Sequence, residues 1–468
     1  MTERTRGTVT RHARGAVTLV VLAALAVAIT LIAGCSGGGA GGIDARPRLL
    51  LFGVDAANWN TLTPMLEAGE LPNIARLVRN GTYGVLKSGE PIQSPQMWTS
   101  IATGVVPERH GITGFTAEVP GSTDELPVTN NMRRVKAFWN VLSEENVTVG
   151  IVGWWPSWPV DEVNGFMIAQ RAWPMNWSLH GIPFGAARDR NGRLIVQDFP
   201  GRTYPEALYE DFERFVMTEE DVTVEDLNQF FADSRFTDAR RQFYARWVYA
   251  KDRTFADAGL YYYEREKPEV FAIYLQGTDV VSHYYWGYQT DEGFTVSPDD
   301  ERMYGQVVRN YYAFVDDVIG SFLDVAPEGT AVLLVSDHGF ETKRDLKVRW
   351  ERGEAIRTVE GGKDVPWDHG IDGAIIMSGP GIRQGVRTED VSVVDVMPTL
   401  MAYLRQPVAE DLDGRPVTEL FEDDNAAAHP VEWVPTYETG EARGNGAPMA
   451  SPMDEGIKEK LRSLGYIE

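Results

Sequence analysis

Seven side chains of this sequence have the types and local spacings needed to hold metal ions beside a nucleophile. Six are carboxylates or imidazoles, which are costly to bury unpaired, whereas shared divalent cations would offset their desolvation. The seventh is a serine. The seven residues are Asp55, Ser94, Asp279, His283, Asp337, His338 and His369. This combination indicates metal-assisted hydrolysis of an anionic ester.

Two apolar runs lead directly into members of this set. The run Leu49 to Val54 ends at Asp55, and the run from Ala331 to Val335 ends one residue before Asp337 and His338. Continuous apolar runs of this length are typical of strands buried on both faces of a parallel sheet. Because open α/β sheets place their sites at the carboxyl ends of the strands, we expect these ligands to meet there.

Two further features, one pair of residues and one serine, have an alternative interpretation when taken alone. Asp279 and His283 lie four positions apart, so one turn of helix would let both face the same ion. A pair with this spacing is also common as a surface ion pair or hydrogen-bonded pair. Ser94 begins a segment with helical character, and an ordinary helix-capping serine would look the same.

The order of apolar and amphipathic segments predicts an α/β fold, with a mainly parallel central sheet flanked by helices on both faces. We expect strands to Asp55, over 147–154 and over 270–275, and helices over 71–80, after Ser94 and over 455–464. Residues from about 174 to 267 are aromatic-rich and irregular, with a helix over 237–266. This block is predicted to be a cap inserted into the one domain formed by residues 46–468.

The first 34 residues have the character of an export signal. Four arginines precede a charge-free stretch from Ala16 to Ala33, which is followed by Gly34 and Cys35. This ending resembles the bacterial lipobox, which implies cleavage before Cys35, acylation of its thiol and a lipidated Gly-rich tether over 35–45. The alternative is an uncleaved helix close to the lower length limit for spanning a bilayer.

Composition limits the other function classes. Cys35 is the only cysteine, so a large core rather than an internal disulfide must stabilise the domain. The formal net charge of −24 argues against nucleic-acid binding through a basic surface. It does not exclude a small anionic substrate, because bound cations reverse the local potential of a site.

The series as a whole resembles the alkaline phosphatase superfamily, and within it the type I phosphodiesterase and nucleotide pyrophosphatase family. The resemblance rests on the order of the seven residues and on three segments around them. These segments are Pro91 to Gly104 with Pro107 to Ile112, Asp337-His338-Gly339, and Asp368 to Gly373. It implies an alkaline-phosphatase-like fold with an inserted cap.

The resemblance also implies roles for the residues. Ser94 takes the position of the catalytic nucleophile, forming a phospho-enzyme that water hydrolyses. Two divalent metal ions are implied, zinc by the donor types, with manganese as the alternative. Asp279, His283 and His369 would hold the first ion, and Asp55, Ser94, Asp337 and His338 the second.

One position departs from the family pattern. The family carries an asparagine about 21 positions after the nucleophile that donates to a phosphate oxygen, and Phe115 stands there in this chain. Arg133, Arg134 and Lys136 are candidate substrate-binding replacements. A solvated basic patch is the alternative interpretation of these three side chains.

Together these features predict an exported, lipid-anchored, metal-dependent phosphodiesterase acting on a small phosphate ester, held in the bacterial cell envelope as a lipoprotein through its N-terminal lipid. A phosphomonoesterase or a phospho-head-group transferase would use the same site. A non-catalytic surface lipoprotein is the third possibility. Sulfate esters fit less well, because the motif that generates formylglycine is absent from the sequence. The sequence does not indicate the oligomeric state.

Overall fold

The computed structural model describes residues 46–174, 187–188, 194–195, 199–236, 239–289, 294–343, 356–357, 367–439 and 446–467. Residues 47–468 form one compact unit. The predicted signal peptide over 1–34 and the tether over 35–45, with Cys35, lie outside the described residues. Within the described ranges, no helix combines the length and the apolar character needed to cross a bilayer.

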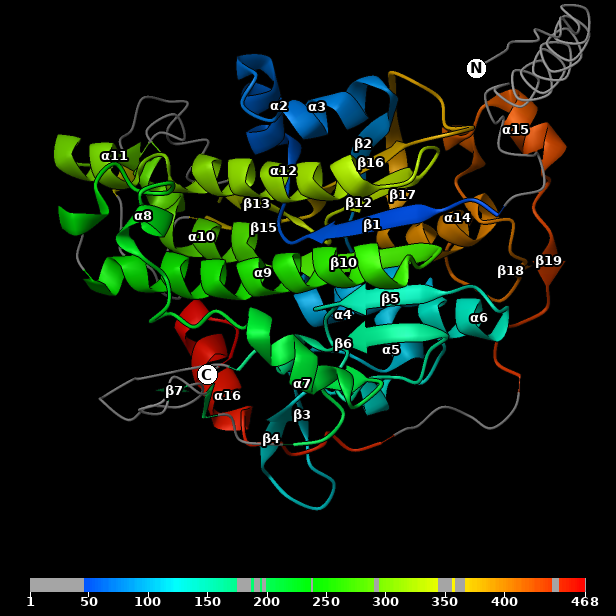
Figure 1. Ribbon diagram of the computed structural model, residues 1–468, viewed down its shortest axis with the longest axis horizontal. Coiled ribbons are helices and arrows are strands. Elements are labelled where there is room, and N and C mark those ends of the chain that lie inside the picture. The colour runs from blue at the N-terminus through cyan, green and yellow to red at the C-terminus, as the bar shows by residue number, and fades with distance from the viewer. Residues whose placement is uncertain are drawn as a thin grey trace, which may run out of the picture. The chain divides into compact units, whose positions relative to one another are not determined.

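A nine-stranded sheet runs through the centre of the molecule (Figure 1). Five of its eight strand pairings are parallel and three are antiparallel, which confirms the predicted mainly parallel α/β sheet. In spatial order the strands are β17 (Val386–Ser392), β2 (Gly81–Lys87), β16 (Asp372–Ser378), β12 (Ala331–Val335), β1 (Leu49–Val54), β10 (Val270–Leu275), β5 (Val149–Val152), β6 (Gly165–Ile168) and β9 (Thr203–Tyr204).

Strand β1 lies at the middle of this sheet and is buried throughout. Successive side chains of a strand point to opposite faces. Accordingly, Leu50 and Phe52 join one hydrophobic cluster, whereas Leu49 and Leu51 join the other. The continuous apolar run seen in the sequence is therefore a strand covered on both faces.

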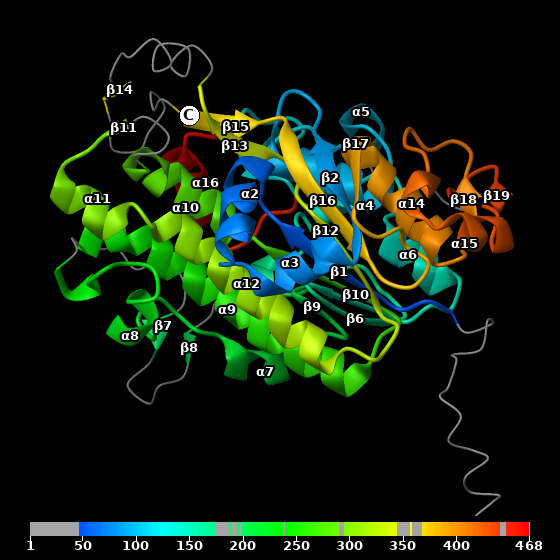
Figure 2. The same cartoon turned by 90° about the horizontal axis from the view of Figure 1, so that it is seen from above.

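Helices supply the two covering layers, as Figure 2 shows from above. One cluster contains side chains of α2 (Trp59–Ala68), α3 (Pro72–Arg79), α9 (Ala239–Glu266), α10 (Gly277–Tyr285) and α12 (Val307–Val325). The other contains side chains of α4 (Ser94–Thr103), α6 (Phe138–Glu144) and α14 (Val396–Tyr403). The predicted covering of both faces is thus confirmed.

The described parts of the segment from 174 to 267 take part in these layers. Strand β9 pairs with β6 at the edge of the central sheet. Helix α9, which matches the predicted helix over 237–266 where the chain is described, packs Tyr263 against Phe271 of β10. The division into a domain and an inserted cap stays a prediction.

Two elements outside the sheet are important for the site. Strands β13 (Gly339–Thr342) and β15 (Trp367–Gly370) form an antiparallel pair in which His369 lies opposite Phe340. Helix α16 (Asp454–Leu464) docks through a buried ion pair of 3.0 Å between Arg171 and Asp454. Its last turn accepts a 3.1 Å hydrogen bond from the Tyr284 hydroxyl at Ser463 O.

The remaining elements connect these layers. The helices are α5 (Pro107–His110), α7 (Leu208–Phe212), α8 (Val224–Leu227), α11 (Pro298–Tyr304) and α15 (Asp423–Ala428). The short strands are β3 (Thr116–Glu118), β4 (Glu125–Pro127), β7 (Ala187–Arg188), β8 (Leu194–Ile195), β11 (Phe294–Thr295), β14 (Ile356–Arg357), β18 (Val408–Ala409) and β19 (Trp433–Val434).

Candidate active site

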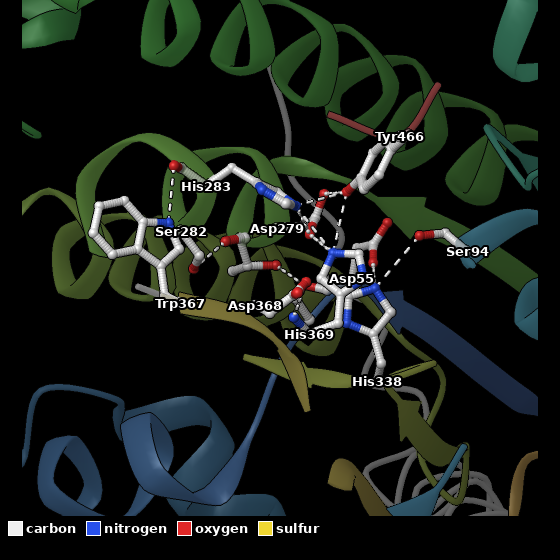
Figure 3. Close-up of polar contacts among 12 residues, drawn as sticks. Asp55, Ser94, Asp279, Ser282, His283, His338, Trp367, Asp368, His369 and Tyr466 are labelled. Atoms are coloured by element: carbon white, nitrogen blue, oxygen red, sulfur yellow. Dashed lines mark hydrogen bonds and ion pairs between the residues drawn. The ribbon is translucent and has the colours of Figure 1, made fainter. Parts of the chain in front are cut away.

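The ends of three neighbouring strands bring the predicted ligands together. Strands β12, β1 and β10 are adjacent and parallel, so their carboxyl ends lie at one edge of the sheet. Asp55 follows β1, Asp337 and His338 follow β12, and Asp279 lies in the first turn of α10, just after β10. Figure 3 shows the resulting cluster.

A first group consists of Asp279, His283 and His369. Asp279 Oδ1 lies 3.3 Å from His283 Nε2 and 3.2 Å from His369 Nε2. The two imidazole nitrogens are 3.0 Å apart. Ligands about 2.0 Å from a tetrahedral zinc ion are separated by about 3.3 Å, so these three atoms have the spacing of a metal's ligand set.

A second group consists of Asp55, Asp337 and His338. His338 Nε2 lies 3.3 Å from Asp55 Oδ1 and 3.5 Å from Asp337 Oδ2. The Ser94 hydroxyl lies 3.4 Å from the same nitrogen. The two groups adjoin, because the His338 and His369 rings stack with centroids 3.9 Å apart.

Backbone features next to the ligands explain how they reach these positions. The chain turns directly after Asp55, with Ala56 in the left-handed region at φ 57°. Strain of this kind often accompanies functional sites. The start of α10 requires Gly277, because a Cβ there would lie 2.0 Å from the Tyr311 ring. That close approach fixes the helix that carries Asp279 and His283.

Several oxygens in the two groups have no hydrogen-bond donor in the described structure. They are Asp55 Oδ1, Asp279 Oδ1 and both carboxylate oxygens of Asp337. Orphaned buried carboxylate oxygens are costly unless a cation satisfies them. His338 Nδ1 is 2.8 Å from Gly339 O, so it can donate there and leave the Nε2 lone pair free for a metal. The residues present therefore fit divalent cations.

The electrostatics of the second group also favour a cation. Burial lowers the affinity of His338 for a proton, yet the facing carboxylates of Asp337 and Asp55 raise its pKa to about 10. Burial and the charge of Asp55 raise the pKa of Asp337 well above its usual range. Positive charge is thus strongly preferred at this point, and a proton occupies it when no metal does.

Ser94 is positioned by the start of α4. It is the first residue of that helix, and the capping residue is Gln93, so Ser94 is not a helix-capping serine. Its side chain is buried and directed toward His338 (Figure 3). A helix N-terminus favours negative charge in front of it, which suits a phosphate held beside this hydroxyl.

The three candidate basic residues have other partners. The Arg133 guanidinium is buried and pairs with Asp161 at 2.6 Å. The Lys136 amine pairs with Glu144 at 2.8 Å. Arg134 is exposed, and its side chain lies against the turn at Gly111. None of these contacts is with a residue of the two ligand groups, and a role in substrate binding stays a prediction.

One residue of the site was not predicted from the sequence. Tyr466, two positions beyond α16, points its hydroxyl at the first group and donates a 3.0 Å hydrogen bond to Asp279 Oδ2. The Tyr466 hydroxyl oxygen lies 2.7 Å from His283 Nε2 and 3.2 Å from His369 Nε2. The Tyr466 ring stacks on Phe115 at 4.4 Å. A phenol from the far end of the chain thus stands beside the position where the expected asparagine is missing.

The family profile described as type I phosphodiesterase / nucleotide pyrophosphatase matches residues 49–431. The chain belongs to this family. Its members are metal-dependent, and the two groups of carboxylates and imidazoles are residues with which this chain could bind metal. The chain is therefore a metal-dependent phosphoric ester hydrolase.

Solved structures with a similar fold include human ectonucleotide pyrophosphatase/phosphodiesterase 5, which is 12% identical with a TM-score of 0.47. The match covers 80% of this chain and 100% of that one. A mutant of the alkaline phosphatase PafA is 13% identical with a TM-score of 0.49, covering 81% of this chain and 99% of that one. A murine counterpart of the human protein, in an inactive form with AMP, is 12% identical with a TM-score of 0.46, covering 80% of this chain and 100% of that one. No curated protein matches.

Metal binding is predicted to compete with protons at His338. Because its pKa of about 10 lies above neutrality, the imidazole must lose a proton before Nε2 can bind a cation. Lower pH therefore weakens binding, and we expect the affinity for Zn²⁺ to fall at least about tenfold per pH unit between pH 8 and pH 6. Competition titrations with a chromophoric chelator measure this slope. His429→Gln, at the end of α15, is the control and should show the same slope of zinc affinity against pH. A wild-type affinity that does not change with pH would contradict the prediction.

Tyr466→Phe is predicted to weaken metal binding about tenfold, because the lost hydroxyl orients Asp279 and contacts both imidazoles. The substitution retains the ring that stacks on Phe115. The same titration measures the effect. Tyr284→Phe removes a phenol hydroxyl that bonds Ser463 rather than a ligand, so it serves as the matched control. Equal affinities for the two variants would show that the Tyr466 hydroxyl has no part in the ligand set.

Proposed function

We propose that this enzyme is a phosphodiesterase or nucleotide pyrophosphatase that uses Ser94 as nucleophile and two divalent ions. Asp279, His283 and His369 would hold the first ion, and the second would be bound by Asp55, Asp337 and His338 together with Ser94. One observation carries the proposal: two adjoining groups of buried ligands lie beside a serine hydroxyl, which is 3.4 Å from His338 Nε2.

The bound cations would lower the pKa of the serine hydroxyl and stabilise charge on the entering and leaving oxygens. Ser94 Oγ loses its proton to solvent and forms a bond to phosphorus, while the bond from phosphorus to the leaving alkoxide breaks and the alkoxide takes up a proton. Water then cleaves the phosphoseryl ester and restores the hydroxyl. The net change is one water consumed, with a monoester and an alcohol released from the diester.

Substrate and metal follow from the chemistry of the donors. Three imidazoles with three carboxylates suit zinc, and manganese is the alternative. The substrate is a small phosphate ester, because positive ions at the site would attract it despite the net charge of −24. A phosphomonoesterase or a transferase of phospho-head groups would use the same residues. The reaction products distinguish these enzymes from a phosphodiesterase.

Ser94→Ala is predicted to lower kcat for bis(p-nitrophenyl) phosphate by about three orders of magnitude or more, because the covalent route needs the hydroxyl. Release of p-nitrophenolate by zinc-loaded protein measures it. Ser100→Ala, on the same helix but with its hydroxyl 3.1 Å from His110 Nε2, is the control and should retain activity. Hydrolysis of p-nitrophenyl phosphate in place of the diester would favour the monoesterase, and undiminished activity of Ser94→Ala would refute the nucleophile.

We also propose that the enzyme is exported and anchored by a lipid on Cys35. Support comes from the charge-free stretch Ala16 to Ala33 and the cysteine that ends it, followed by seven residues of which five are glycine. Cys35→Ser is expected to abolish incorporation of labelled palmitate and to move the protein out of the detergent phase in Triton X-114 partitioning. Unchanged partitioning of this variant would favour an uncleaved membrane helix.

A further inference from the structure

Two buried lysines form a cluster that the ligand groups do not use. Lys251 of α9 and Lys460 of α16 both donate to Gln276 Oε1, at 2.7 Å and 3.0 Å. Gln276 is the capping residue of α10, three positions before Asp279. The cluster therefore lies at the start of the helix that carries two ligands of the first group.

Neither lysine of this pair makes a direct ion pair, although the charge of the buried Asp252 acts on both. Lys251 is 7% exposed and Lys460 is 6% exposed, and within the described ranges neither amine has a carboxylate oxygen within ion-pair distance. Asp252, next to Lys251, is already engaged by the amides of Gln276 and Gly277. Burial lowers the pKa of Lys251 to about 8, and burial together with Lys251 lowers that of Lys460 well below its usual range. Fully buried lysines are almost always paired directly with an anion, and within the described residues that contact is missing here.

A small cavity provides room for that anion. Its volume is about 50 Å³, and Lys251, Lys460 and Gln276 line it together with Trp155, Trp173 and Trp247. A single water needs about 10–15 Å³ of such volume, so the space fits one small anionic group rather than a whole substrate. The indole walls would exclude bulk water and strengthen any charge interaction inside.

Aromatic rings separate the lysines from both ligand groups, two on one side and one on the other. Phe115 also lines the cavity and stacks on Tyr466, whose hydroxyl bonds Asp279. On the other side, the Lys251 amine lies 5.8 Å from the centroid of the Tyr274 ring, and the Tyr274 hydroxyl donates to Asp55. An extended substrate with its ester at the ligand groups would thus have a second end within reach of the lysines.

We propose that Lys251 and Lys460 form an anion subsite that binds a second anionic group, a carboxylate or a phosphate, on the substrate whose ester phosphate occupies the two ligand groups. The proposal rests on the hydrolase function above and narrows its substrate class to phosphate esters that carry a further anion. Tyr466 and Phe115 lie between the two positions, and the substrate would pass beside their rings. The C-terminal segment that supplies Lys460 and Tyr466 then belongs to the substrate site.

The first test compares two diesters that differ by one charge. These are bis(p-nitrophenyl) phosphate and p-nitrophenyl 4-carboxyphenyl phosphate, both followed by p-nitrophenolate release. We expect Lys460→Met and Lys251→Met each to lower the ratio of kcat/KM values, carboxylated over neutral, by about tenfold or more, because a charge-assisted hydrogen bond is lost. Activity on the neutral diester shows that each variant is folded. Lys458→Met, on the same helix but paired with Glu455, is the control and should leave the ratio unchanged.

A second test is independent of turnover. Sulfate, compared with chloride at equal ionic strength, should raise the melting temperature of the wild type and of Asp279→Asn, whose first ligand group is disabled, but not that of Lys251→Met or Lys460→Met. If no diester is cleaved, the hydrolase proposal fails. The melting temperatures with sulfate still test whether the two lysines bind an anion. Equal stabilisation of the lysine variants and the wild type, or a diester ratio unchanged in both lysine variants, would overturn the proposal.

Discussion

The structure depends on buried carboxylates being placed at the ends of three adjacent parallel strands. Asp55, Asp279 and Asp337 all lie within this region and are at most 1% exposed. Three carboxylates so close would repel one another strongly at low dielectric. Imidazoles offset part of that charge: His283 and His369 hold the pKa of Asp279 well below its usual range although burial opposes this. Cations bound by these carboxylates would supply the remaining positive charge and would then attract an anionic ester to a site in an acidic protein.

Much of this arrangement could be predicted from the sequence, for a specific physical reason. Strands buried on both faces must be apolar throughout, so a carboxylate directly after such a run, as Asp55 follows Val54, is conspicuous. Parallel strands also place their ends at one edge, which links residues as distant as Asp55 and Asp337 without any knowledge of contacts. Helix geometry alone predicts that Asp279 and His283, four residues apart, lie on the same face of a helix. His369 was placed by family resemblance and not by periodicity.

The parts that could not be predicted come from docking between segments far apart in the chain. Tyr466 follows a short amphipathic helix with nothing local to mark it, and its position depends on the buried pair of Arg171 and Asp454. The basic side chains at Arg133 and Lys136 were equally ambiguous, because a sequence does not show that Asp161 lies 2.6 Å from Arg133. The sequence shows the charge of each side chain, but only the folded structure shows which residue it pairs with.

The docking of α16 gives the Phe115 side chain a structural role. A phenyl ring cannot donate to a phosphate oxygen, but it can support a neighbouring ring, and Phe115 stacks on Tyr466 with an interplanar angle of 10°. That support holds the phenol hydroxyl against Asp279, to whose Oδ2 it donates a hydrogen bond. The tyrosine comes from the C-terminal segment and the phenylalanine from the loop after α5, so the stacked pair forms only when these two segments pack together. The arrangement of the first group in this chain is therefore coupled to the docking of α16, which links the folding of the last helix to the formation of a complete site.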